Sequence, residues 1–226
     1  KVVIYVFGLD LMQDAHPGEW LIWLAAFTIL ASSLIAMTKD NLKARLAYST
    51  ISQLSYIVLG AALATTASIT GGGLHLVTHA FGKITLFFCA GAIITATHKS
   101  NISEMRGIGR AMPITMIAFF IGSLSVIGLP PLGGAWSKWY LALGAVEADK
   151  ILFVGVLMVS SLLNIAYLIP IVVNAFFPGK KSTQFNKVSE APWTCLAPLL
   201  FTSVGCLILF IYPDPFFNLL TQITRN

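Results

Sequence analysis

Three titratable side chains recur at helical spacing inside an apolar part of the chain. His75, His79 and Lys83 stand four residues apart within Gly71–Thr97, which reads GGGLHLVTHAFGKITLFFCAGAIITAT. This spacing places all three side chains on one face of a helix. From Leu74 onward the stretch is long enough to cross a hydrocarbon core of about 30 Å at a rise of about 1.5 Å per residue. A row of titratable groups across a membrane is what a proton path requires.

Lys83 falls close to the middle of this apolar run. A lysine at the bilayer centre costs about 2.5–3.5 kcal/mol on insertion scales, so it normally faces a bundle interior, a partner charge or water. The central position is too deep for the side chain to reach the lipid headgroups. His75 and His79 have a simpler interpretation as polar packing residues that hydrogen-bond between helices. A zinc site at their spacing is disfavoured, because no cysteine or acidic residue accompanies them.

The composition excludes an ordinary soluble domain. The 226 residues are 57% hydrophobic and 10% charged, with a mean hydropathy of +0.83. Apolar blocks alternate with short polar clusters, as in polytopic helical membrane proteins, and the net charge of +5 is spread over loops. This distribution of charge bears on the membrane topology of the loops and does not indicate nucleic-acid binding. Three cysteines lie singly in apolar blocks, and we identify no catalytic triad, phosphate loop or dinucleotide fingerprint. The sequence therefore predicts no metal and no cofactor, and it leaves open whether the chain serves an enzyme.

The apolar blocks predict an all-α integral membrane protein with about six spans. The expected spans are Trp20–Met37, Leu46–Ala67, Leu74–Thr97, Pro113–Val146, Ile151–Phe177 and Trp193–Tyr212. We expect a turn at Ser68–Gly73 and, after Tyr212, an amphipathic tail at the membrane interface. Residues 1–8, KVVIYVFG, resemble the tail of a helix cut partway, which predicts that residues 1–226 are one partial transporter domain of a longer protein. No signal peptide is expected.

The segment Gly128–Gly134, GLPPLGG, must interrupt one of these spans, because two prolines break a helix. If residues 113–146 are one interrupted crossing, the loops at 38–45, 98–112 and 178–191 share a side of the membrane. Each of these loops carries three basic residues against one acidic residue. The positive-inside rule favours this arrangement, with the three loops in the cytoplasm.

Lys138 follows the interruption and is the second candidate lysine. Irregular backbone within a membrane must be buried in protein or line a wet cavity, and interrupted helices mark ion sites in transporters. The alternative is a lysine that snorkels to the interface beside Trp136 and Trp139. Earlier in the chain, Gln53 and Tyr56 belong to an unusually polar half-helix that either holds water or joins helices.

Three segments resemble one family. LKARLAYSTISQLSYI, HLVTHAFGKITLFFCAG and GLPPLGGAWSKWYLALGAVEA are similar to the second half of the antiporter-like proton-translocating subunits. That family is shared by respiratory complex I and the multisubunit Mrp-type cation/proton antiporters. The ending SKWYLALGAVEA and the segment EAPW (Glu190–Trp193) are closer to the large D subunit of the Mrp type.

The resemblance implies a role for five residues. Lys83 matches the lysine at the middle of the family's hydrophilic axis, and His75 and His79 match histidines on the same helix. Lys138 matches the terminal lysine on the broken helix. Lys43 matches the lysine of a link motif, although from the residues alone it is a charge of a cytoplasmic loop. The implied fold is the second of two inverted five-helix repeats plus one further helix.

These observations predict proton translocation by a subunit of a monovalent cation (Na⁺)/H⁺ antiporter in the bacterial inner membrane. The expected partners are other membrane subunits, protons, Na⁺ and the lipid bilayer. Two alternatives remain open. One is a proton-pumping membrane subunit of an NADH:quinone oxidoreductase or hydrogenase-type complex, with the redox chemistry in partner subunits. The other is a structural membrane scaffold whose lysines pair between helices.

Overall fold

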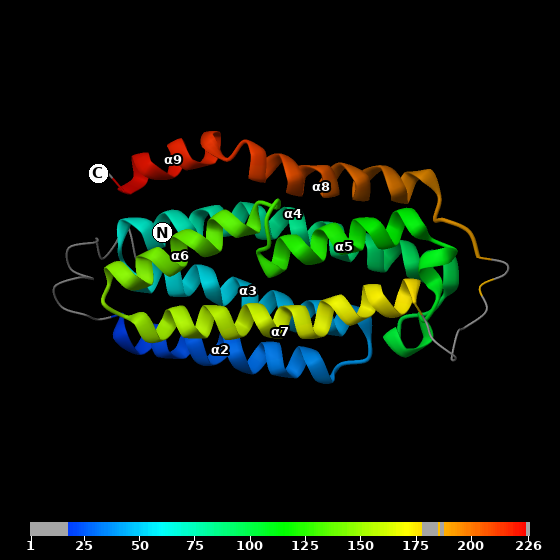
Figure 1. Cartoon of the computed structure of the whole chain (residues 1–226), viewed down its shortest axis with the longest axis horizontal. Helices are drawn as coiled ribbons and strands as arrows, with labels where there is room; N and C mark the ends of the chain where they lie inside the picture. The colour runs from blue at the N-terminus through cyan, green and yellow to red at the C-terminus, as the bar shows by residue number, and fades with distance from the viewer. Residues whose placement is uncertain (1–17, 178–184, 186–187, 225–226) are drawn as a thin grey trace.

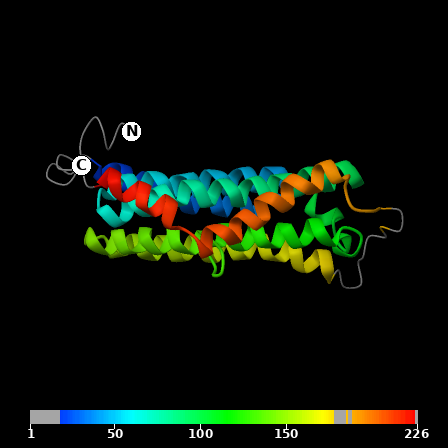
Figure 2. The same cartoon turned by 90° about the horizontal axis from the view of Figure 1, so that it is seen from above.

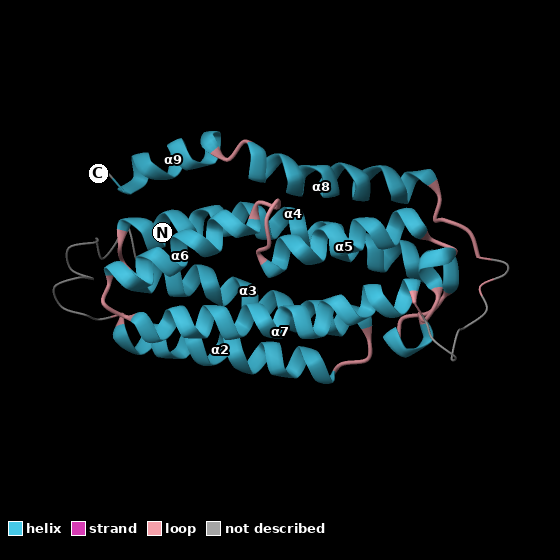
Figure 3. Cartoon of the chain, viewed as in Figure 1, coloured by secondary structure: helices cyan, strands magenta, loops and turns pink. Residues whose placement is uncertain are grey.

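The computed structural model describes residues 18–177, 185 and 188–224, and this part of the chain is helical without a β-strand (Figures 1 and 3). The long helices are α2 (Glu19–Thr38), α3 (Leu42–Leu63), α4 (Thr66–Thr97), α7 (Ile151–Phe176) and α8 (Trp193–Ile211). The shorter ones are η2 (Ile102–Glu104), η3 (Ile108–Arg110), α5 (Pro113–Ile127), α6 (Gly134–Glu147) and α9 (Asp214–Thr224). The predicted helix tail at residues 1–8 and most of the loops at 10–19 and 178–191 lie outside the described residues.

The helices form an elongated bundle in which most of them run along one axis (Figures 1 and 2). Five described helices, α2, α3, α4, α7 and α8, are long and apolar enough to cross a membrane. Many of their large apolar side chains are exposed on the outside of the bundle, whereas polar side chains are buried inside it. This inverted distribution is that of a helical membrane protein. The prediction of an all-α polytopic membrane fold is confirmed.

Helices α5 and α6 lie end to end along the bundle and together make one interrupted crossing (Figure 1). With 15 and 14 residues, each is about 22 Å long and too short to cross alone. Helix α5 ends at Gly128 in a left-handed conformation, with φ of 89°. The predicted break at Gly128–Gly134 is therefore confirmed.

Helix α8 covers the break. The N–H of Gly133 donates to the carbonyl oxygen of Cys206 at 3.1 Å, and the indole N–H of Trp136 donates to the carbonyl oxygen of Phe210 at 3.0 Å. The first bond gives the irregular backbone a partner inside the protein, as a location within a membrane requires, and the second joins α6 to the end of α8. Beyond α8, helix α9 packs against α4. The amphipathic tail thus forms a helix that lies beside the bundle (Figure 2).

The expected turn at Ser68–Gly73 is wrong, because these residues lie inside α4. Helix α3 ends earlier than expected, at Leu63, and α4 begins at Thr66 with a capping box between Thr65 and Ser68. The glycines serve close helix packing instead of a turn. A Cβ atom on Gly71 would lie 2.6 Å from the backbone nitrogen of Leu141 in α6. Small residues allow such an approach between membrane helices. A glycine-rich turn and a glycine-rich packing surface have the same sequence pattern.

The contact between α4 and α6 generates a stability prediction. Gly71→Ala is expected to lower the free energy of unfolding by about 1–3 kcal/mol, because backbone atoms of α6 occupy the space of the new methyl group. Gly91→Ala in the same helix meets no atom within 4 Å, so it should leave stability unchanged or raise it by up to about 1 kcal/mol. Thermal unfolding of both variants in detergent micelles measures the difference. Equal stability of the two variants would contradict this packing.

Candidate functional site

The three titratable side chains of α4 lie on one buried face. His75, His79 and Lys83 are 2%, 8% and 5% exposed, and the two imidazole rings stack with centroids 5.8 Å apart. Lys83 stands near the middle of the 32-residue helix. The structure therefore places these residues as their spacing predicts, inside the bundle.

The ammonium group of Lys83 is held by α3. Its Nζ donates to the hydroxyl oxygen of Ser49 at 2.7 Å and to the carbonyl oxygen of Leu46 at 3.2 Å. Both partners are neutral oxygens. The Ser49 hydroxyl also lies 2.7 Å from the hydroxyl of Tyr167 in α7, and that hydroxyl bonds the side-chain oxygen of Asn164. A hydrogen-bonded chain therefore leads from Lys83 through α3 into α7.

Lys138 reaches back across the break in its crossing. Its Nζ donates to the carbonyl oxygen of Ile127, the last residue of α5, at 2.8 Å, and to the hydroxyl of Ser161 in α7 at 2.9 Å. A cation at the carboxyl end of a helix satisfies free carbonyl groups and complements the helix dipole. Lys138 also lines a mostly apolar cavity of about 500 Å³ between the break and α7. The Lys138 side chain is half-buried, at the edge of the bundle.

Tyr56 of α3 connects the second lysine with the histidines. The ammonium of Lys138 lies 5.0 Å from the centroid of the Tyr56 ring, and the same ring stacks on His75 at 5.2 Å. The Nδ1 atom of His75 is 3.0 Å from the hydroxyl of Ser137 in α6, the residue before Lys138. Contacts thus run from Lys138 through Tyr56 and His75 to His79, and Lys83 lies one helical turn further along α4.

Unpartnered polar atoms gather along the same row. In the described residues, six buried side-chain nitrogen and oxygen atoms have no hydrogen-bond partner. They are both amide atoms of Gln53, the hydroxyl of Tyr56, Nε2 of His75, Nε2 of His79 and Nδ2 of Asn164. Buried polar atoms are nearly always paired with protein groups or ordered water, and a roomy polar site holds water. These six atoms are therefore the candidate binding positions of internal water along the row.

The sequence reasoning missed the contribution of α7. Asn164 and Tyr167 complete the environment of Lys83, and Ser161 binds Lys138. Their polar side chains recur at helical spacing in an otherwise apolar helix. That interruption of an apolar pattern is the signal that would have identified them.

Lys43 is not brought to this row. It is exposed at the start of α3, on the stripe of that helix that also presents Ile51 and Leu54 to the outside. The groups that meet Lys83 lie on the opposite, buried stripe of α3. No group of three His, Cys, Asp or Glu side chains suited to a metal ion occurs among the described residues.

Known proteins share this sequence and fold. Residues 2–164 match the family described as NADH:quinone oxidoreductase/Mrp antiporter, TM. The chain is 38% identical over 203 residues to the NADH-quinone oxidoreductase subunit N of Desulforudis audaxviator, covering 85% of this chain and 40% of that protein. The chain thus spans less than half the length of this curated relative.

Two solved structures share the fold. The chain superposes on the Mrp complex from Dietzia sp. with a TM-score of 0.84 at 21% identity, covering 94% of this chain and 48% of that chain. It superposes on respiratory complex I from Thermus thermophilus with a TM-score of 0.80 at 20% identity, covering 98% and 50% of the two chains. Both kinds of assembly therefore contain this helical arrangement.

The hydrogen bonds of Ser49 generate a second prediction. Ser49→Ala removes a partner from both Lys83 and Tyr167, and we expect a loss of about 1–3 kcal/mol in the free energy of unfolding. Ser55→Ala is the matched control, because its buried hydroxyl bonds only the carbonyl of Ile51 in its own helix. Its effect should stay within about 0.5 kcal/mol. Thermal unfolding tests the pair, and a Ser49 variant as stable as the Ser55 variant would exclude the inferred support of Lys83.

Proposed function

Because the chain belongs to the NADH:quinone oxidoreductase/Mrp antiporter family, we propose that it carries protons across a membrane as part of one subunit of a multisubunit complex. The observation that supports this most is the coincidence of buried titratable side chains with unpartnered polar atoms. Lys83 and the two histidines are buried on one face of α4, with Lys83 near the middle of the helix, and the unpartnered atoms include Nε2 of both histidines. Titratable groups joined by water are the parts of a proton relay.

In this proposal Lys83 takes up and releases the proton, and His75 and His79 relay it through water. Burial favours the neutral form of an amine, whereas a nearby anion or a wet cavity favours the charged form. Changes in the hydration of the row therefore switch the protonation of its members. A lysine ammonium has three donors, and Lys83 uses two of them for Leu46 and Ser49. The third donor remains for a water molecule of the proposed relay.

Lys138 exchanges the proton with bulk water at one end of the row. It borders the cavity beside the break, which supplies a route to the outside of the bundle. Its ammonium group stabilises the free carbonyl end of α5 through Ile127. Loss of the proton weakens that interaction, so proton transfer at Lys138 is coupled to the contact across the interrupted helix.

We further propose that the parent complex is a Na⁺/H⁺ antiporter of the Mrp type in the bacterial inner membrane, with other membrane subunits as partners. The segments SKWYLALGAVEA and EAPW support the large D subunit of such a complex. The 38% identity to a NADH-quinone oxidoreductase subunit favours the second candidate, a redox-driven proton pump. The chain covers 40% of the length of this relative, and in either complex we propose that residues outside this chain also contribute to the path of the proton.

The transport proposal is tested with Lys83→Ala in the complete protein and its neighbouring subunits. Everted membrane vesicles are loaded with a fluorescent dye that reports ΔpH. We expect transport to fall by about 100-fold, the lower end of what a positioned proton-transfer group contributes. The control Lys43→Ala should transport normally, because Lys43 is exposed outside the row. Normal proton transport by Lys83→Ala would contradict the proposal and favour a structural scaffold.

Two energy sources distinguish the parent complexes in the same vesicles. Addition of NaCl to respiring vesicles collapses ΔpH if the complex is a cation/proton antiporter. Addition of NADH as the only electron donor acidifies the vesicles if the complex is a redox-driven pump. In each case, loss of the ΔpH response in the Lys83→Ala variant assigns that response to this chain.

The role of internal water gives a further prediction. Gln53→Leu removes two unpartnered buried polar atoms at nearly constant side-chain size. We expect the free energy of unfolding to stay equal or to rise, while proton transport falls because a water-binding group is lost. Thermal unfolding and the vesicle assay together measure this separation, with Ser55→Ala as the control. Unchanged transport in Gln53→Leu would show that the amide holds no water of the relay.

A further inference from the structure

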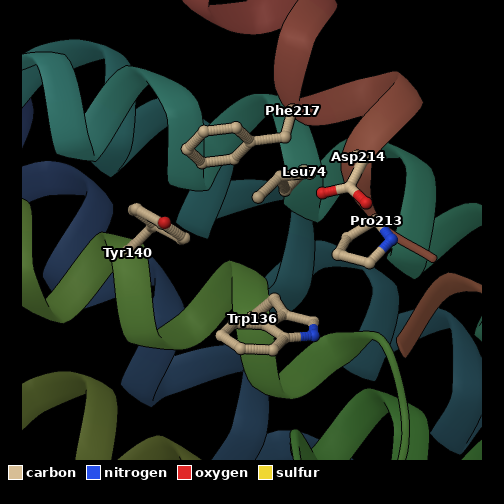
Figure 4. A pocket seen from close by; sticks show the side chains of 6 residues that line it. All are labelled: Leu74, Trp136, Tyr140, Pro213, Asp214 and Phe217. Carbon is tan, nitrogen blue, oxygen red and sulfur yellow. The ribbon is translucent and has the colours of Figure 1, made fainter. Parts of the chain in front are cut away.

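A second, smaller pocket lies on the other face of α6 from Lys138 (Figure 4). It has a volume of about 240 Å³ and is formed by α4, α6 and the junction between α8 and α9. Its lining residues are Leu74, Trp136, Tyr140, Pro213, Asp214 and Phe217. Trp136 and Tyr140 stand one turn apart on α6, two residues before and after Lys138, which accounts for the opposite direction of their side chains.

Three aromatic rings make most of the pocket wall. Figure 4 shows Trp136, Tyr140 and Phe217 around a common space. The indole of Trp136 is held from behind, because it stacks on Phe210 at 5.7 Å and donates its N–H to the carbonyl oxygen of the same residue. The rings of Tyr140 and Phe217 contact each other at 5.3 Å and at an angle of 49°. The walls are therefore positioned by the protein before any ligand arrives.

Asp214 supplies a carboxylate to this aromatic pocket, and Figure 4 shows one of its oxygens directed toward the space between the rings. Asp214 is the first residue of α9, one position after the N-cap residue, whose side chain would accept bonds from free N–H groups. The N–H groups of Phe216 and Phe217 donate to the carbonyl oxygen of Pro213, at 3.1 and 3.0 Å. The lining contains no basic side chain. Within the described lining, the exposed Asp214 therefore supplies one negative charge, and no side chain supplies a positive one.

We propose that this pocket binds a small organic ammonium cation of the choline or ethanolamine type. Aromatic faces attract such cations when they lie within about 6 Å of the ring centroid, and the carboxylate adds an ion pair. The volume is below the range of about 300–1,000 Å³ that accommodates drug-sized molecules. A hard metal cation requires several oxygen ligands, whereas this lining offers a single carboxylate among aromatic rings.

Two sources supply the same chemistry. Leu74 lies eight residues from the start of α4, about 12 Å from that end of a helix about 48 Å long, and Trp136 is the third residue of α6 after the interruption. The pocket therefore lies between the interruption and that end of the bundle. The ammonium group belongs either to a phospholipid headgroup or to a free solute, and the choice of lipid in the test distinguishes the two. This inference does not depend on proton transport.

The test is equilibrium binding of choline and of tetramethylammonium, measured by isothermal titration calorimetry. The protein is placed in nanodiscs of phosphatidylglycerol, a lipid without an ammonium group. We expect saturable binding that weakens by about tenfold in Asp214→Asn and stays unchanged in Glu147→Gln, an exposed carboxylate at the end of α6. Equal binding by both variants, or displacement of choline by NaCl at the same concentration, would overturn the proposal.

A second pair of variants tests the aromatic wall. Trp136→Phe keeps a ring and should retain most of the affinity, whereas Trp136→Leu should lose it. Thermal unfolding of each variant checks that the fold is intact. Equal choline affinity in the Trp136→Phe and Trp136→Leu variants would refute the cation–aromatic contact.

Repeating the titration in phosphatidylethanolamine nanodiscs identifies the source. Weaker choline binding there assigns the pocket to a lipid headgroup, and unchanged binding assigns it to a free ammonium compound.

Discussion

The buried ammonium group of Lys83 is the constraint on which the centre of the bundle depends. A charged group removed from water needs hydrogen-bond partners, or the cost of burial is not offset. Those partners are the Leu46 carbonyl and the Ser49 hydroxyl, so α3 must present a small polar residue at this level of α4. The Ser49 hydroxyl in turn contacts Tyr167 in α7. One lysine thereby ties α4 both to α3, the helix that precedes it in the chain, and to α7, which is distant in sequence.

The two lysines of the row are coordinated in the same way. Lys83 binds one backbone carbonyl and one serine hydroxyl, and Lys138 does the same through Ile127 and Ser161. Each ammonium group therefore has two neutral partners and one remaining donor. A strong ion pair would hold the proton in place, whereas neutral oxygens and water leave its release accessible. In the proposed relay the interrupted helix contributes to this arrangement, because the end of α5 exposes the carbonyl that Lys138 binds.

Much of the site could be predicted from local pattern. The four-residue spacing of His75, His79 and Lys83 was sufficient to place them on one face, because the period of a helix is set by its own backbone. The adjacent prolines were sufficient to predict the break for the same local reason. The turn expected at Ser68–Gly73 was wrong because glycine also permits close packing, and only the position of Leu141 in α6 distinguishes the two uses.

The sequence by itself therefore determined the class of protein, the buried row on α4 and the interrupted crossing, since these depend on composition and on contacts between near neighbours in the chain. Only the tertiary structure decided what surrounds the row. The contacts of Lys83 with Ser49, the stacking of Tyr56 on His75 and the meeting of Asp214 with Trp136 all join residues on different helices. The chain brings such residues together only after its helices pack, because the side-chain shapes of the whole bundle determine which faces meet.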